Sequence, residues 1–348
     1  MKPLQPRGAP DAMPFRFTRA VSVSACIVLA CVGLRAQTVD PALPRYRAEA
    51  KVSGILAGTT GMDTVEAMMG AWDEAFKRFH PGADITITMK PVGPEERIAL
   101  GPNTDEVFSP DNLAYENAHG CEPFRVRVCL GAFVLKSHVT AIGVFVNKDN
   151  PITKLSLAEL DAIYSAERRR GYPAGIVTWG QLGLTGEWAD RPVHPYGFYW
   201  RQDVTRVFRE LAMFDAPFND RYRVPGSDRM RRTPPLAADL VKTLAEDRGG
   251  IVFGNFNFFQ DDRLKPLALA DRDGGLGQPV ADDMANARYP LQRFIYIYVH
   301  RVPGQPLDPL AKEFLAFVLS RDGQELVAKD HYLPLPAVLA AAERAKLE

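Results

Sequence analysis

The sequence predicts an α/β protein with two lobes, and three observations support this. The chain has 348 residues, which is enough for two lobes with separate hydrophobic cores. Its apolar share of 46% is ordinary for a folded protein. Short runs of β-branched and aromatic residues alternate with longer segments whose apolar residues repeat at helical spacing. Strands and helices that alternate in this way favour sheets covered by helices.

Residues 1–36 have the composition of a cleaved export signal. Arg16 and Arg19 supply a positive flank, and residues 20–34 are almost all apolar or small. The apolar run is shorter than the roughly 20 residues that a membrane span needs. We therefore expect an exported, periplasmic protein in which residues 37–50 are a linker.

The cysteines leave two questions open. Cys31 loosely resembles a lipoprotein cysteine, but Leu29 is unusual in that context, so a signal without a lipid anchor is favoured. Cys121 and Cys129 remain after cleavage, and an exported protein can oxidise them to a disulfide. Sequence spacing does not give the Cα geometry that the bond needs. Two half-buried thiols are an equally good interpretation.

The first regular elements form a strand–helix–strand unit. Residues 52–57 predict a strand, and Asp63 with Glu66 has the pattern of a capping box that begins a helix. Isoleucines and threonines alternate over residues 85–89, which predicts a second strand. Strands joined through one helix are usually parallel. The helix carries an apolar stripe made of Val65, Met68, Met69, Trp72, Phe76 and Phe79.

The middle of the chain predicts more strands and helices between long loops. Ser156 and Glu159 form a second capping-box pattern. The apolar residues of 203–213 repeat at the spacing of a half-buried helix. Further strands are expected at 126–134, 140–146, 193–197 and 251–256, a further helix at 236–247, and mostly loop at 264–288.

The closing stretch, residues 289–336, is the most regular part of the chain. Residues 294–299 predict a buried strand. A helix follows, with Leu310, Phe314, Phe317 and Val318 on one face, and Asp322-Gly323 is expected to end it.

Six segments, in the same order, resemble the phosphate-binding proteins of ABC transporters. They are residues 61–72, VFVNKDNP at 144–151, LSLAELDAIYS at 155–165, TWGQLGLTGEW at 178–188, 225–227 and the closing stretch. The resemblance implies a type 2 periplasmic-binding-protein fold, with a ligand cleft between two lobes and two hinge crossings. It divides the chain into lobe 1, residues 51–145 plus 294–348, and lobe 2, residues 146–293.

The resemblance also implies an anion site built from helix N-termini and hydroxyl groups. Unpaired N–H groups and the helix dipole favour an anion, and hydroxyls donate hydrogen bonds without adding charge. The expected ligand is a small anion such as phosphate. The protein is expected to be a monomer, and its expected partner is an inner-membrane ABC permease. The candidate ligand-binding residues are Thr59, Thr60, Asp63, Thr64, Arg201, Thr205 and Ser227.

Several of the expected anion donors are absent. Met62 stands where the family has a serine, and Pro94-Glu95-Glu96 replaces a Gly-Ser-Ser loop. Phe198 stands in place of an arginine, and Gln202-Asp203-Val204 in place of Ser-Gly-Thr. Asp203 is expected to cap its own helix and so occupy the N–H groups that an anion would use. We hypothesise that phosphate binding is weak or lost.

Other functions have less support. Lys plus Arg and Asp plus Glu balance at 42 each, so nucleic acid is not expected. The six histidines show no metal-site spacing, no catalytic motif appears, and neither a cofactor nor a metal is expected. Residues 168–170 and 229–232 carry short basic clusters, read as solvated surface.

Two function hypotheses remain, a solute-binding protein and a ligand-poor relative acting as an interaction or sensory module. Aromatic residues near the expected cleft favour core packing over stacking on an organic ligand. They are Phe198, Tyr199, Trp200, Phe253, Phe256, Phe258 and Phe259.

Overall fold

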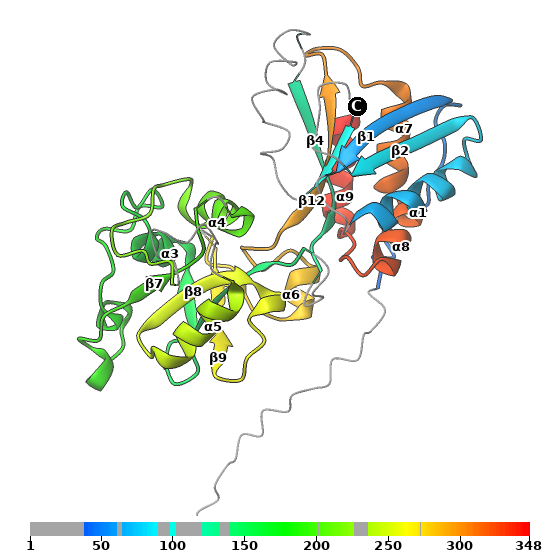
Figure 1. Cartoon of the computed structure of the whole chain (residues 1–348). Helices are drawn as coiled ribbons and strands as arrows, with labels where there is room; N and C mark the ends of the chain where they lie inside the picture. Colours follow the sequence, from blue (N-terminus) through cyan, green and yellow to red (C-terminus); the bar gives the residue numbers. More distant parts are fainter. Residues whose placement is uncertain are drawn as a thin grey trace, which may run out of the picture. The chain divides into compact units, whose positions relative to one another are not determined.

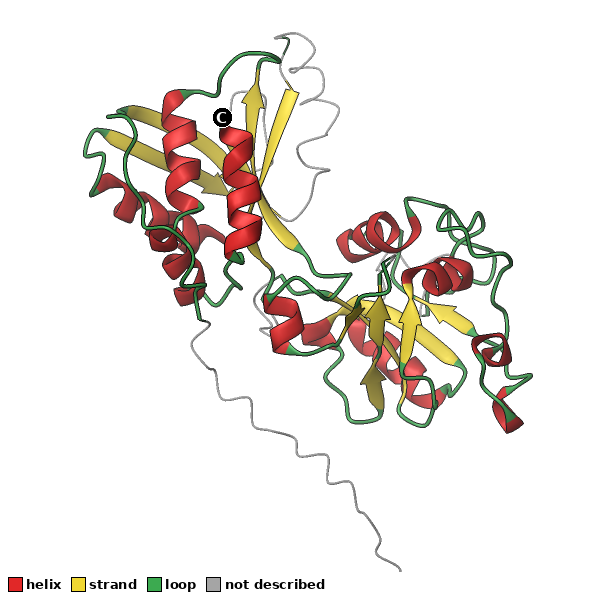
Figure 2. Cartoon of the chain, turned by 180° about the vertical axis from the view of Figure 1, so that it is seen from behind, coloured by secondary structure: helices red, strands yellow, loops and turns green. Residues whose placement is uncertain are grey.

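The computed structural model describes residues 38–60, 65–89, 98–101, 120, 122–132, 139–200, 202–225, 236–271 and 273–348. The chain is α/β, as predicted, and its strands form separate sheets with helices packed on them (Figures 1 and 2). In the described ranges, every helix is too short or too polar to cross a lipid bilayer.

The first sheet joins the start of the described chain to its closing stretch. Its strand order is β2-β1-β3-β12-β4, with β1 parallel to β2 and β3 and β12 antiparallel to β3 and β4. The parallel pairing predicted for the first two strands is confirmed. The strands are β1 (Gly54–Thr60), β2 (Ala83–Met89), β3 (Ile98–Gly101), β4 (Glu122–Leu130) and β12 (Phe294–Arg301).

Helix α1 (Glu66–Lys77) packs on this sheet through the predicted stripe. Trp72 and Phe76 are fully buried, and burying side chains of this size contributes about 1.5–3 kcal/mol each. The Trp72 indole N–H donates to the Gly323 carbonyl at 2.9 Å, which ties α1 to a helix of the closing stretch. The prediction for Phe79 is wrong, because the helix ends before it and the side chain is exposed.

The closing stretch forms β12 and then helices α7 (Pro309–Val318), α8 (Arg321–Lys329) and α9 (Ala337–Arg344). The predicted apolar face of α7 is buried. The prediction that Asp322-Gly323 ends this helix is wrong. Helix α7 ends at Val318, and Ser320 begins α8 by accepting a hydrogen bond from the Gly323 N–H at 3.3 Å.

Residues 38–50 pack against these helices, and we call them the N-terminal strap. The Tyr46 hydroxyl lies between the His80 ring, at 2.7 Å, and the Glu313 carboxylate, to which it donates at 2.6 Å. The Glu49 and Ala50 N–H groups donate to the other Glu313 oxygen. The segment predicted as a linker is therefore fastened to α7 by a buried hydrogen-bond network.

The middle of the chain forms a four-stranded sheet, β7-β8-β5-β9, and a three-stranded sheet, β11-β10-β6. β5 (Ile142–Asn147) is buried along its whole length and pairs antiparallel with β8 (Gly250–Asn255) and β9 (Leu264–Pro266). β7 (His194–Tyr196) runs parallel to β8. The three-stranded sheet consists of β6 (Lys154–Ser156), β10 (Ala268–Ala270) and β11 (Leu276–Gly277).

Helices α3 (Leu157–Tyr164), α4 (Asp203–Met213) and α5 (Ala237–Glu246) accompany these sheets. The Ser156–Glu159 capping box is confirmed, with hydrogen bonds in both directions. Leu236, where the helix at 236–247 was predicted to begin, is 67% exposed because α5 begins after it. The prediction of mostly loop at 264–288 missed β9, β10, β11 and α6 (Ala281–Ala285), which are too short to show a periodicity. Short 3₁₀ helices lie at Trp179–Leu182, Gly186–Trp188, Phe256–Phe258 and Ala345–Leu347.

Cys129 is a free thiol, fully buried in β4. Burial raises its pKa well above the ordinary value for a thiol. Cys129 is therefore a free thiol, although it is fully buried and not half-buried as the free-thiol interpretation had it. Cys121 lies outside the described residues.

Candidate functional site

Two of the seven predicted site residues have described side chains. Thr60, at the end of β1, and Thr205, in the first turn of α4, are both fully buried. The backbone of Thr59 lies in β1, but its side chain is outside the described residues, as are Asp63, Thr64, Arg201 and Ser227. The altered loops at Met62 and Pro94-Glu95-Glu96 are outside them too. The site as a whole stays a prediction.

The first turn of α4 is the predicted anion-binding segment that the structure does describe. Gln202 is the N-cap, and its side chain does not cap the helix. Asp203 is the first helical residue, so the prediction that its carboxylate caps α4 is wrong in detail. The Thr205 hydroxyl faces the Tyr222 hydroxyl, which donates to the Phe198 carbonyl at 2.6 Å. Burial raises the pKa of Tyr222 well above its ordinary value.

Asp203 forms an ion pair with an arginine of the closing stretch. Its Oδ2 accepts from Arg293 Nη2 at 2.6 Å, and Arg206 Nη2 lies 3.9 Å from Oδ1. The Arg293 side chain is 3% exposed, whereas that of Asp203 is 38% exposed. Arg293 comes directly before β12, and its carbonyl accepts from the Gly131 N–H at 2.8 Å. The pair therefore joins α4 to the start of the strand β12.

Sequence reasoning missed Arg293. None of the predicted ligand-binding residues lies in the closing stretch, and a single arginine directly before an apolar strand carries no motif. One signal was present, because a charged side chain next to a buried strand needs a partner of opposite charge.

Arg170 caps the other end of α4, and Arg209 binds the loop that follows. Arg170 donates to the Ala212 carbonyl at 2.6 Å and to the Leu211 carbonyl, and its guanidinium lies 3.9 Å from the Phe214 ring centroid. Arg209 donates to the carbonyls of Asp215 and Ala216. Burial lowers the pKa of Arg170. The interpretation of residues 168–170 as solvated surface is thus wrong for Arg170, because it neutralises the C-terminal end of the helix dipole.

The aromatic residues near α4 separate into two sets. Phe198, Phe253, Phe256 and Phe259 are buried, and Phe253 stacks on Phe208 with ring centroids 3.8 Å apart. Core packing is therefore the correct interpretation for these four. The exposed set consists of Tyr199, Trp200 and Phe258.

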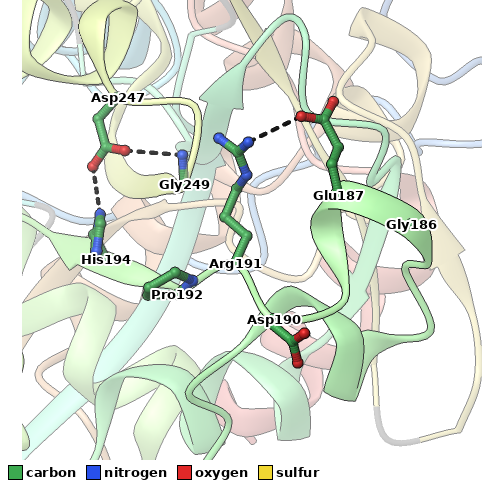
Figure 3. A pocket seen from close by; sticks show the side chains of 8 residues that line it. All are labelled: Gly186, Glu187, Asp190, Arg191, Pro192, His194, Asp247 and Gly249. Atoms are coloured by element: carbon green, nitrogen blue, oxygen red, sulfur yellow. Dashed lines mark hydrogen bonds and ion pairs between the residues drawn. The ribbon is translucent and has the colours of Figure 1, made fainter.

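A cavity of about 520 Å³ lies elsewhere, beside β7 (Figure 3). His194 Nδ1 lies 2.7 Å from Asp247 Oδ2, and the Gly249 N–H donates to Asp247 Oδ1 at 2.9 Å. Arg191 pairs with Glu187 at 3.1 Å, and Figure 3 shows the Asp190 carboxylate lying away from both pairs. The charged groups that line the cavity thus bind one another. Through Asp247 they join β7 to the residue just before β8.

A tyrosine of β7 also binds Asp247. The Tyr196 hydroxyl donates to Asp247 Oδ2 at 2.8 Å. Burial, followed by this hydrogen bond, raises the pKa of Tyr196 to about 12. In the described part of the chain, no group of three or more His, Cys, Asp or Glu side chains is arranged to hold a metal ion.

Comparison with known proteins identifies the family. Residues 47–322 match the family model described as PBP superfamily domain. The phosphate-binding protein PstS of Pseudomonas aeruginosa is 36% identical over 309 residues, which are 87% of this chain and 90% of that protein. Protein SphX of Synechococcus elongatus is 23% identical over 292 residues, 83% of this chain and 80% of that protein. The crystal structure of PstS from Borrelia burgdorferi has a TM-score of 0.49 at 13% identity and covers 81% of this chain and 99% of that one.

The family model and the 36% identity each span most of the chain. They confirm both the two-lobed type 2 binding-protein fold and the family that the six segments predicted. The chain belongs to the PBP superfamily and, within it, to the family of periplasmic phosphate-binding proteins.

Proposed function

We propose that the chain is an exported solute-binding protein, related to the binding component of a phosphate transporter, in which the phosphate site is weakened or lost. The observation that carries the proposal is the Asp203–Arg293 ion pair at the first turn of α4. By the family resemblance, this turn is one of the places where the anion binds. Here a carboxylate of the protein already lies there, together with its own counter-ion.

Electrostatics supports this proposal. Two unit charges 4 Å apart interact by about 4 kcal/mol at an effective dielectric constant near 20. A phosphate dianion next to Asp203 would meet that repulsion, and it would compete with Asp203 for Arg293. The dipole of α4 is already compensated at both ends, by Asp203 and by Arg170 and Arg209. The helix therefore offers an anion less than a helix with a free N-terminus does.

The role in transport is part of the same proposal. The relative that is 36% identical is named as a phosphate-binding protein, so we expect a periplasmic monomer that serves an inner-membrane ABC permease and catalyses no reaction. Export rests on residues 1–36, which lie outside the described residues.

Isothermal titration with sodium phosphate tests the proposal. The protein is purified from the periplasm of a bacterial host, and any bound solute is removed by dialysis in denaturant and refolding. We expect no binding tighter than about 100 μM. Micromolar affinity or better would show that the site is intact and would overturn the proposal.

The variant Asp203→Ser sharpens the test, because it removes the carboxylate and adds a hydroxyl donor. We expect phosphate to bind at least about tenfold more tightly to this variant, a gain of about 1.4 kcal/mol. Asp190→Ser is the matched control, since Asp190 is an exposed carboxylate away from α4. Equal phosphate affinity of both variants would contradict the role given to Asp203.

A further inference from the structure

A second cavity, of about 190 Å³, lies on the side of α4 that faces the closing stretch. Its walls come from α4, the edge strand β4, strand β12 and the segment that leads into β12. Arg293 lines it while its guanidinium pairs with Asp203. The other residues used below are Arg125, Val207, Glu210, Leu211, Phe294 and Tyr296.

Besides Arg293, two side chains of opposite charge line this cavity, Arg125 and Glu210. The Arg125 guanidinium lies 5.0 Å from the centroid of the Tyr296 ring. Burial raises the pKa of Tyr296, the charges of Arg125 and Arg127 lower it, and that of Glu210 raises it. Arg125 and Glu210 therefore both act on the same ring. Arg125 also interacts with the Tyr298 side chain.

The remaining walls are apolar. Val207 and Leu211 extend the half-buried face of α4, and Phe294 lies on β12. These side chains donate no hydrogen bonds, so they add nothing to the binding of an inorganic anion. They can bury an aliphatic group, at about 25 cal/mol for each Å² of apolar surface removed from water. The volume is below the roughly 300–1,000 Å³ of sites for drug-sized ligands, so the solute is small.

We propose that this cavity binds a free α-amino acid with an apolar side chain. Its carboxylate lies against Arg125, its ammonium group against Glu210 and its side chain against Val207, Leu211 and Phe294. The inference deepens the proposed function, since it names a solute class for a binding protein that has lost phosphate. A zwitterion fits because the two charges of the cavity are opposite and Arg293 is already neutralised by Asp203.

Calorimetry with the purified, solute-free protein tests the inference. L-valine, L-leucine and L-methionine are titrated first. Two analogues of leucine follow, 4-methylpentanoate, which lacks the ammonium group, and 3-methylbutylamine, which lacks the carboxylate. We expect at least one of the three amino acids to bind, and both analogues to bind at least about tenfold more weakly than leucine. No binding of any of the three, or equal binding of leucine and either analogue, overturns the inference.

Two variants assign the charges. Glu210→Gln should weaken leucine binding at least tenfold and leave the weak binding of 4-methylpentanoate unchanged, because that analogue has no group for Glu210. Arg125→Met should weaken leucine and leave 3-methylbutylamine unchanged. Glu210 is exposed, so its variant will fold, and Glu74→Gln, an exposed glutamate of α1, is the matched control. Leucine binding that neither variant weakens would place the ligand elsewhere and overturn the assignment.

The phosphate titration separates the two proposals. Tight phosphate binding contradicts the proposed function whatever the amino acids do. Weak phosphate binding without amino-acid binding contradicts the inference alone.

Discussion

Glu313 and Asp203 are both carboxylates that accept short hydrogen bonds, yet their surroundings differ in kind. Glu313 is 5% exposed, and its described donors are a tyrosine hydroxyl and two backbone N–H groups. Asp203 is 38% exposed, and its main partner is a buried arginine. The first carboxylate holds a segment of chain in place. The second balances a charge at a helix end where relatives are expected to bind a ligand. The number and kind of donors thus distinguish a structural carboxylate from the one that we propose takes the place of a ligand.

The largest effect is expected from Glu313→Ala. It leaves the Tyr46 hydroxyl and two backbone N–H groups without their acceptor, and each buried donor left unsatisfied costs about 1–3 kcal/mol. Because the N-terminal strap can partly detach and hydrate, we expect a loss of about 3 kcal/mol in the free energy of unfolding, measured with urea. Glu74→Ala, at an exposed site of α1, should change it by less than about 0.5 kcal/mol. A loss below 1 kcal/mol for Glu313→Ala would contradict the structural role given to Glu313, and with it the difference from Asp203.

A double-mutant cycle on Asp203 and Arg293 should give the next largest effect. Asp203→Ala leaves a buried guanidinium without its carboxylate, and we expect a loss of about 2 kcal/mol, less than for a fully buried pair because Asp203 is partly hydrated. Arg293→Met should cost less, since Asp203 can turn to water. The double variant should be more stable than the sum of the two losses implies. Additive losses in urea unfolding would mean that the two side chains do not interact.

Arg170→Met should have a smaller effect, of about 1 kcal/mol. It removes two hydrogen bonds to the last carbonyls of α4 and a cation at the negative end of its dipole. Arg168→Met is the neighbouring control, as Arg168 donates only to the exposed Ala166 carbonyl through its side chain. Equal urea midpoints for the two variants would mean that Arg170, like its neighbours, is solvated surface and does not stabilise α4.

The smallest effect is a pH dependence from His80. Burial lowers its pKa, while Glu313 acts in the opposite direction. As the pH falls, His80 therefore stays neutral to a lower pH in the folded protein than in the unfolded chain. The stabilisation is present above the unfolded pKa near 6.5 and is lost as the pH falls through the lower, folded value. Urea midpoints should therefore drop between pH 7 and pH 5, and the drop should be smaller for His80→Asn. The same slope in both proteins would assign the titration to other groups.

The sequence was sufficient where the physical signal is local and repeated. The α1 stripe, the Ser156–Glu159 capping box and the strands β5, β8 and β12 all have periodicities or caps visible within a dozen residues. Strands of two or three residues, such as β9 and β11, are too short for any periodicity, and only their pairing partners define them.

The candidate site depended on contacts that are distant in the sequence. Asp203 was identified as a changed residue, but its partner Arg293 lies 90 positions away. Arg125 and Glu210 are likewise brought to one cavity by the fold and not by spacing. The strap was predicted to be a linker because it contains Pro41 and Pro44, whereas the hydrogen bond between Tyr46 and Glu313 makes it a fixed part of the structure.

Cys129 gives this protein a reporter of its own folding. Its thiol is free, buried in the edge strand β4 and held protonated by its surroundings, so a thiol reagent can reach it only when the first sheet opens. With Cys26, Cys31 and Cys121 replaced by serine, the rate of labelling would follow the opening of that sheet alone. A solute that binds beside β4 would slow the labelling. An unknown ligand could then be found by screening for protection of one sulfur atom, without an assay for transport.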